Sequence, residues 1–101
     1  MSDELHIEIV GIVWYRRDQY ELAKTIMVDG ANLPPTYSAW LHAAQQVVER
    51  VKGAGKTPVR AYIDPATFPI WCQARGLDIN ADARNQFANI VAYHSRTMGN
   101  A

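Results

Sequence analysis

Two adjacent arginines and one aspartate stand where α/β proteins commonly bind anions. Tyr15, Arg16 and Arg17 directly follow an apolar segment, and Asp64 directly follows a second β-rich segment. If the two segments are parallel strands, these residues meet at one edge of a sheet, beside the amino end of the next helix. Guanidinium groups bind carboxylates and phosphates, and a helix amino end favours anions. These four residues are the candidate ligand-binding site; the alternative is that both arginines are solvated and Asp64 only caps a helix.

The remaining reactive side chains form no recognisable motif. Cys72 is the single cysteine, and it follows Trp71 in an apolar segment, which is typical of a buried thiol rather than of a nucleophile paired with a histidine. The histidines are far apart in the sequence, and no zinc-binding spacing or glycine-rich phosphate loop is present. We therefore predict no catalytic residue, no metal site and no cofactor. The three histidines are His6, His42 and His94.

Composition limits the class of protein. The chain has 101 residues, so we expect one globular domain spanning 1–101. Ten Lys and Arg balance ten Asp and Glu, which argues against a dedicated nucleic-acid or anionic-membrane binder. No segment is long and apolar enough for a membrane span, and the acidic start does not resemble a secretory signal. With a lone cysteine, no intrachain disulfide can form, and we expect a cytoplasmic protein.

Two segments have the composition of strands. The residues 7–15 are β-branched, aromatic or glycine apart from one glutamate, and the residues 59–63 alternate and are rich in β-forming types. The intervening chain is long enough for a crossover, so a parallel pairing is allowed. Residues 1–5 are a candidate third strand.

Four segments have helical spacing. We expect a short helix opened by a capping box of Asp18 and Glu21, and a helix over 36–52 capped by Thr36. A third helix should begin at Asp64-Pro65 and end at Gly76, and a fourth should be capped by Asn80 or Asp82. The buried positions that we expect are Leu22, Ala23, Ile26 and Met27 in the first helix, Tyr37, Trp40, Leu41, Ala44, Val48 and Val51 in the second, and Ala83, Phe87, Ile90, Val91 and His94 in the fourth.

The order strand, helix, helix, strand, helix, helix predicts an α/β or α+β fold. Its sheet would have two or three strands covered by about four helices. A two-stranded sheet has two open edges and is marginal alone. Pairing with a second copy across a two-fold axis would complete a four-stranded sheet, so we expect a homodimer.

Several motifs follow one another between Trp14 and Ala92, and together they resemble a family of short bacterial proteins of about this length. The resemblance implies a bacterial setting and brings no known activity, cofactor or catalytic residue. The motifs are Val13-Trp14-Tyr15-Arg16, Leu33-Pro34-Pro35-Thr36-Tyr37, Trp40-Leu41, Val59-Arg60, Asp64-Pro65, Phe68, Trp71-Cys72, Gly76, Asp82, Ala83-Arg84 and Phe87.

Aromatic residues are numerous for so small a chain, with three Trp, five Tyr and two Phe. Most should fill the core, and the rest are of the types enriched at protein interfaces. Tyr37, beside two prolines, and Tyr93, near the end of the chain, are the two that we expect at an interface.

Three functions are therefore open. The first is a bacterial cytoplasmic interaction or accessory protein that self-associates and contacts a protein partner, without an enzymatic role. The second is a binder of, or an enzyme acting on, a small anionic ligand near Arg16, Arg17 and Asp64. The third is a nucleic-acid binder that presents Arg84 and nearby amide side chains on its last helix pair, although Asp78 and Asp82 there would repel phosphates.

Overall fold

A computed structural model describes residues 8–99 of the chain, with side chains up to residue 96. The elements follow the predicted order, with a one-turn 3-10 helix before α1 and another after it. In chain order they are β1 (Ile9–Trp14), η2 (Arg17–Gln19), α1 (Tyr20–Ile26), η3 (Gly30–Asn32), α2 (Tyr37–Gly53), β2 (Thr57–Tyr62), α3 (Phe68–Ala74) and α4 (Ala81–Gly99).

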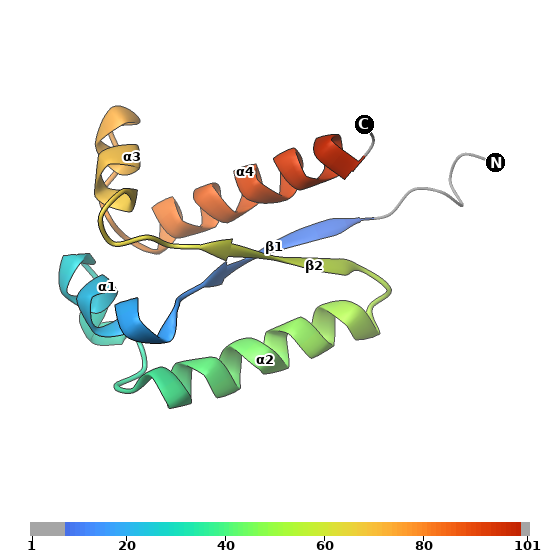
Figure 1. Cartoon of the computed structure of the whole chain (residues 1–101), viewed down its shortest axis with the longest axis horizontal. Helices are drawn as coiled ribbons and strands as arrows, with labels where there is room; N and C mark the ends of the chain where they lie inside the picture. Colours follow the sequence, from blue (N-terminus) through green and yellow to red (C-terminus); the bar gives the residue numbers. More distant parts are fainter. Residues whose placement is uncertain (1–7, 100–101) are drawn as a thin grey trace.

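The two strands pair in parallel, and a helix covers each face of the sheet. Ile9 lies opposite Thr57 and Trp14 opposite Tyr62, so the carboxyl ends of both strands meet at one end of the sheet. Figure 1 shows three layers, with α4 on one side of the strands and α2 on the other. The fold class is therefore α/β, as predicted, and the described residues contain a sheet of two strands. The third strand expected over residues 1–5 falls outside the described residues.

Helix α4 approaches β1 closely because of one glycine. A Cβ built on Gly11 would lie 2.0 Å from the backbone oxygen of Ala88. The buried residues near this contact are also small: they are Ala88 and Ala92 of α4 and Ala61 of β2. Gly11, which we predicted only to lie within a strand, thus sets the distance between the sheet and α4.

The opposite face of the sheet rests on aromatic rings. Trp40 of α2 packs against Trp14 and Tyr15 with ring centroids 5.1 Å apart in both pairs, and against Tyr37 at 5.4 Å. Tyr20 joins this group through Tyr15 at 5.5 Å. These five rings are the aromatic cluster of the α2 face. A second group, Phe68, Trp71 and Phe87, lies between α3 and α4.

Two of the predicted helix starts are confirmed. The Thr36 hydroxyl accepts a hydrogen bond from the Ala39 N–H at 3.1 Å, and the Asn80 side chain accepts one from Ala83 at 3.1 Å. Gly76 follows α3 with a φ of +68°, in the left-handed region that favours glycine.

The other two helix starts were predicted wrongly. Asp18 and Glu21 form no capping box, because residues 17–19 first make a 3-10 turn and α1 begins after Gln19 without a side-chain cap. The third helix begins at Phe68 rather than at Asp64-Pro65. Asp64 instead closes a preceding turn, in which its Oδ1 accepts the Ala66 N–H at 2.8 Å.

Two expected core residues lie at the surface. Leu22 of α1 is 58% exposed, and His94 of α4 is exposed. In α4, Ala88 and Ala92 are buried one turn apart beside Gly11, and Ala83 is buried near the start of the helix, while Phe87, Ile90 and Val91 are half-buried. The side of α4 that carries Ala88 and Ala92 faces β1, because only small side chains fit against Gly11. No helix among the described residues is both long and apolar enough to span a bilayer.

Candidate functional site

The four residues predicted to bind a ligand differ in their exposure and in the groups that they contact. The Arg16 guanidinium lies over the ring of Tyr62, 4.2 Å from its centroid, so it does reach the end of β2. The Arg17 guanidinium turns instead to the ring of Tyr37, at 4.7 Å. Asp64 is exposed, and its carboxylate is engaged by the Ala66 N–H. Tyr15 is 1% exposed and lies in the core beneath this surface.

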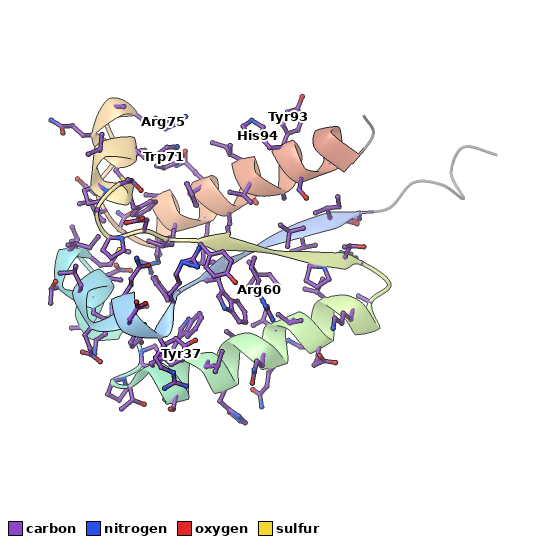
Figure 2. All side chains as sticks on the ribbon, viewed as in Figure 1. Tyr37, Arg60, Trp71, Arg75, Tyr93 and His94 are labelled. Atoms are coloured by element: carbon purple, nitrogen blue, oxygen red, sulfur yellow. The ribbon has the colours of Figure 1, made fainter. Side chains whose placement is uncertain are left out.

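A third arginine, which sequence reasoning missed as a site residue, joins the first two. Arg60 of β2 is exposed, and its guanidinium lies 4.4 Å from the ring centroid of Trp14. Figure 2 shows Arg60 between β2 and α2. The sequence signal that could have identified Arg60 as a site residue is the alternation of side chains along a strand, which places Arg60 and Tyr62 on the same face. The register then sets Tyr62 beside Trp14.

These three arginines and the rings beneath them form what we call the arginine–aromatic surface: Arg16, Arg17, Arg60, Trp14, Tyr37 and Tyr62. Its supporting rings are well packed. Trp14 is only 5% exposed, and Trp40 contacts both Trp14 and Tyr37. The surface therefore has a rigid aromatic floor at the carboxyl end of the sheet.

The loop that leads into α2 is held against the same cluster. The Tyr20 hydroxyl donates a hydrogen bond to the carbonyl oxygen of Pro34 at 2.6 Å, and the Lys24 ammonium donates one to Pro35 at 3.1 Å. These two bonds fix the chain just before Tyr37. Tyr37, predicted at an interface, is half-buried and carries Arg17 on its ring.

The arginines of this surface have no carboxylate partner in the part of the chain that the structure describes. Within residues 8–96, the ion pairs are Lys24 with Glu21, Lys52 with Glu49, Lys56 with Glu8 and Arg84 with Asp29. None of the three surface arginines takes part in these pairs, and none donates a side-chain hydrogen bond to another described residue. Three exposed positive charges are thus gathered at one end of a chain whose net charge is zero.

Arg84 has the opposite environment. Its two terminal nitrogens donate to the two carboxylate oxygens of Asp29 at 2.8 and 3.0 Å, and one of them also contacts the Met27 sulfur at 3.4 Å. Arg84 is 8% exposed, and its hydrogen bonds lower the pKa of the Asp29 carboxyl. The expectation that Arg84 projects outward from the last helix pair is therefore wrong, because its guanidinium holds the loop before η3 against α4.

Asn85, Gln86 and Asn89 do lie on the exposed side of α4. Nucleic-acid binding through this helix pair thus rests on amide side chains without the expected arginine.

Tyr15 lies next to this buried ion pair. Burial raises the pKa of its hydroxyl to about 12. The hydroxyl has no hydrogen-bond partner in the part of the chain that the structure describes. A phenol with so high a pKa stays neutral and gives no support to a proton-transfer role at neutral pH.

Cys72 and the larger surface depression contribute no site. Cys72 is fully buried, and burial raises the pKa of its thiol, which opposes thiolate formation. The depression of about 520 Å³ beside His42 is lined by one exposed face of α2, with no second element to close it. Among residues 8–99, no three metal-binding side chains are grouped.

Tyr93, the other predicted interface residue, is 58% exposed and lies on α4 (Figure 2). It borders a shallow hollow of about 200 Å³ that is lined by Ile9 of β1 and by Asn89, Ala92, Tyr93 and Arg96 of α4. No residue of β2 lines it, so the hollow lies on the side of β1 that faces away from β2.

Comparisons of the chain with models of protein families, with curated proteins and with solved structures find no match.

Proposed function

We propose that this protein is a bacterial, cytoplasmic interaction module that forms a homodimer through the free edge of β1. The observation that carries the proposal is the direction of the backbone groups. The Thr57 N–H donates to the Glu8 carbonyl, and the Ile63 N–H donates to the Trp14 carbonyl, both at 2.9 Å. In a parallel ladder the even-numbered residues of β1 therefore face β2. The N–H and C=O groups of Ile9, Gly11 and Val13 point away from it and have no partner among the described residues.

The two edges of the sheet differ in their protection. The outward positions of β2 are Pro58, Arg60 and Tyr62, and a proline lacks the N–H that a further strand would need. Proline and charged side chains are common ways to block an edge strand. The outward positions of β1 carry neither. This difference favours β1 as the edge that pairs.

A second copy is the partner that matches this edge. Two β1 strands related by a two-fold axis at Gly11 run antiparallel, and each Ile9 then lies opposite the other copy's Val13. Ile9, Gly11 and Val13 then each form a hydrogen-bonded pair with a residue of the other copy's β1, and the two sheets join into one of four strands. The axis is perpendicular to the sheet, so both α4 helices lie on the same face. Their sides bearing Tyr93 and the adjacent hollow then face one another, which agrees with the expected interface role of Tyr93.

The cytoplasmic location is part of the same proposal. The single cysteine is buried and unpaired, so the fold requires no oxidising environment.

Replacing Ile9 by proline tests the dimer. Ile9 is the first residue of β1, where proline is tolerated, and the change removes its outward N–H. Two hydrogen bonds are lost per dimer at about 1 kcal/mol each, so the dissociation constant should rise about thirtyfold. Sedimentation equilibrium should give twice the 11.3 kDa chain mass for the wild type, and circular dichroism checks that the variant is folded.

Ile9→Val keeps the N–H and should leave the dimer intact. Amide exchange gives an independent measurement, because in the dimer the amides of Gly11 and Val13 should exchange as slowly as those of Val10 and Ile12. A folded monomer at micromolar concentration, with fast exchange at Gly11 and Val13 only, contradicts the proposal.

A further inference from the structure

We propose that Arg16, Arg17 and Arg60 bind a small ligand that carries two or more phosphate groups. The ligand would lie on the arginine–aromatic surface, at the carboxyl end of β1 and β2. Parallel sheets bind their ligands at this end. The proposal is independent of the dimer, because the surface is formed by the face of the sheet that α2 covers and by the outward side of β2.

The arginines are held in place before any ligand arrives. Each guanidinium lies between 4.2 and 4.7 Å from the centroid of an aromatic ring. A guanidinium over a ring face keeps its five N–H donors, which lie in its own plane, available to a ligand. Because the side chains are already positioned, less conformational entropy is lost on binding than with freely rotating arginines.

Arg16 and Arg60 come together through the strand register. Trp14 and Tyr62 are opposite residues on neighbouring strands and point to the same face. Arg60 lies over the first ring and Arg16 over the second. These two positive charges, which pair with no carboxylate among residues 8–96, repel each other, and an anion between them would relieve this repulsion.

Arg17 extends the surface in the direction of α2. Its guanidinium lies over the Tyr37 ring. Trp40 connects this ring to Trp14, with centroid distances of 5.4 Å to Tyr37 and 5.1 Å to Trp14. A second anionic group is needed to reach it, and a single carboxylate would leave most of the positive charge unneutralised. Phosphate groups supply both the charge and the oxygens that several guanidinium groups can share.

Titration with inorganic pyrophosphate tests this assignment. The wild-type protein should bind it in isothermal titration calorimetry at low ionic strength and should change its tryptophan fluorescence, since Trp14 lies directly beneath Arg60. Arg16→Gln and Arg60→Gln should each weaken binding about tenfold or more. Arg60→Lys keeps the charge but loses the planar donor fork, so it should weaken binding by less than Arg60→Gln.

Arg75→Gln is the matched control. Arg75 is exposed and lies 4.3 Å from the ring centroid of Trp71, the same arrangement on the other aromatic group. Its replacement should leave pyrophosphate affinity unchanged. The proposal is overturned if the folded wild type shows no binding at millimolar pyrophosphate, if Arg75→Gln weakens binding equally, or if citrate binds as tightly as pyrophosphate. Binding of a mixed-sequence single-stranded oligonucleotide without pyrophosphate binding would also overturn it, in favour of a nucleic-acid strand.

Discussion

Five of the seven arginines of this chain fall into two groups whose environments give them different tasks. Arg84 is buried and forms two hydrogen bonds to one carboxylate, which compensates the cost of removing both charges from water. Arg16, Arg17, Arg60 and Arg75 are exposed and lie on aromatic rings, where the guanidinium remains hydrated and its charge is not neutralised. The first group stabilises the fold, and the second leaves positive charge available to a ligand.

Replacing Asp29 by asparagine should destabilise the protein by about 2 kcal/mol at neutral pH, because Arg84 loses the charge that compensates its burial. The cost should be below that of a fully buried pair, since the Asp29 side chain is 22% exposed. Urea denaturation measures the difference. Asp78→Asn, at an exposed aspartate that forms no ion pair among the described residues, should change stability by less than about 0.5 kcal/mol. Equal effects of the two substitutions would contradict a stabilising Arg84–Asp29 pair.

The same pair makes stability depend on pH in a defined direction. The pKa of Asp29 in the folded protein lies below its ordinary value of 3.8, so the unfolded chain takes up the proton first as the solution is acidified. The stabilisation is complete above the unfolded pKa and is lost as pH falls through the folded pKa. The difference between wild type and Asp29→Asn should therefore shrink as the pH is lowered below 3.8. Denaturation curves at several pH values check this, and a difference that grows on acidification would contradict the assignment.

At the level of the elements, small residues decide how the layers pack. α4 presents two buried alanines, Ala88 and Ala92, to the sheet, and Gly11 leaves room for its backbone. α2 packs through large side chains instead, with Trp40, Ala44 and Val48 as its buried positions. The two faces of one small sheet are thus covered at different distances, close on the glycine side and farther on the aromatic side.

Gly11→Ala should destabilise the protein by about 3 kcal/mol, because the new methyl group would meet the Ala88 carbonyl and force α4 away from β1. Thermal or urea unfolding followed by circular dichroism measures the effect. Gly53→Ala is the control, since a Cβ there meets nothing within 4 Å at the end of α2, and it should stabilise by about 0.5 kcal/mol. A Gly11→Ala protein as stable as the wild type would contradict the close approach of α4.

For the molecule as a whole, the sheet is the unusual feature, because it has only two strands within residues 8–99. Helices bury both of its faces, but its two edges lie on the broad sides of the molecule, toward and away from the reader in Figure 1. A purely parallel sheet of two strands buries little backbone by itself. In the proposed dimer, a second copy would add backbone hydrogen bonds to the sheet, and assembly would then contribute to stability.

If the dimer is the folded form, the melting temperature should depend on protein concentration. Raising the concentration from about 1 to 100 µM favours the dimer by RT ln 100, about 2.7 kcal/mol per dimer, and for a chain of this length should raise the melting temperature by about 5 °C or more. Scanning fluorimetry with the native tryptophans measures it. Ile9→Pro should show a much smaller dependence, and a constant melting temperature for the wild type would contradict assembly-linked folding.

The elements were predictable because their signals are local. The spacing of Trp40, Ala44 and Val48 identifies α2, the Thr36 and Asn80 side chains cap the helices that follow them, and Gly76 ends α3. Such features depend on neighbours within one or two turns, which a sequence displays directly. The helix starts at Asp18 and Asp64 were predicted wrongly because aspartate closes turns as readily as it caps helices, and only the following chain decides between them.

The candidate site was predictable only in part. Segment order allowed a parallel pair with Arg16 at its carboxyl end but did not require one. The stacking of Arg60 on Trp14 depends on the strand register, which brings together two residues 46 positions apart in the chain. The burial of Arg84 requires Asp29, a contact between residues 55 apart in the chain. Neither contact has a local signature.

The sequence by itself determined the α/β class and the order of the elements, because periodicity and composition act within each segment. The tertiary structure alone decided which arginine is buried against a carboxylate, which three form the arginine–aromatic surface, and which edge of the sheet carries a proline at an outward position. These outcomes depend on strand register and on the distance between layers, and both are set by contacts between segments that are remote in the chain.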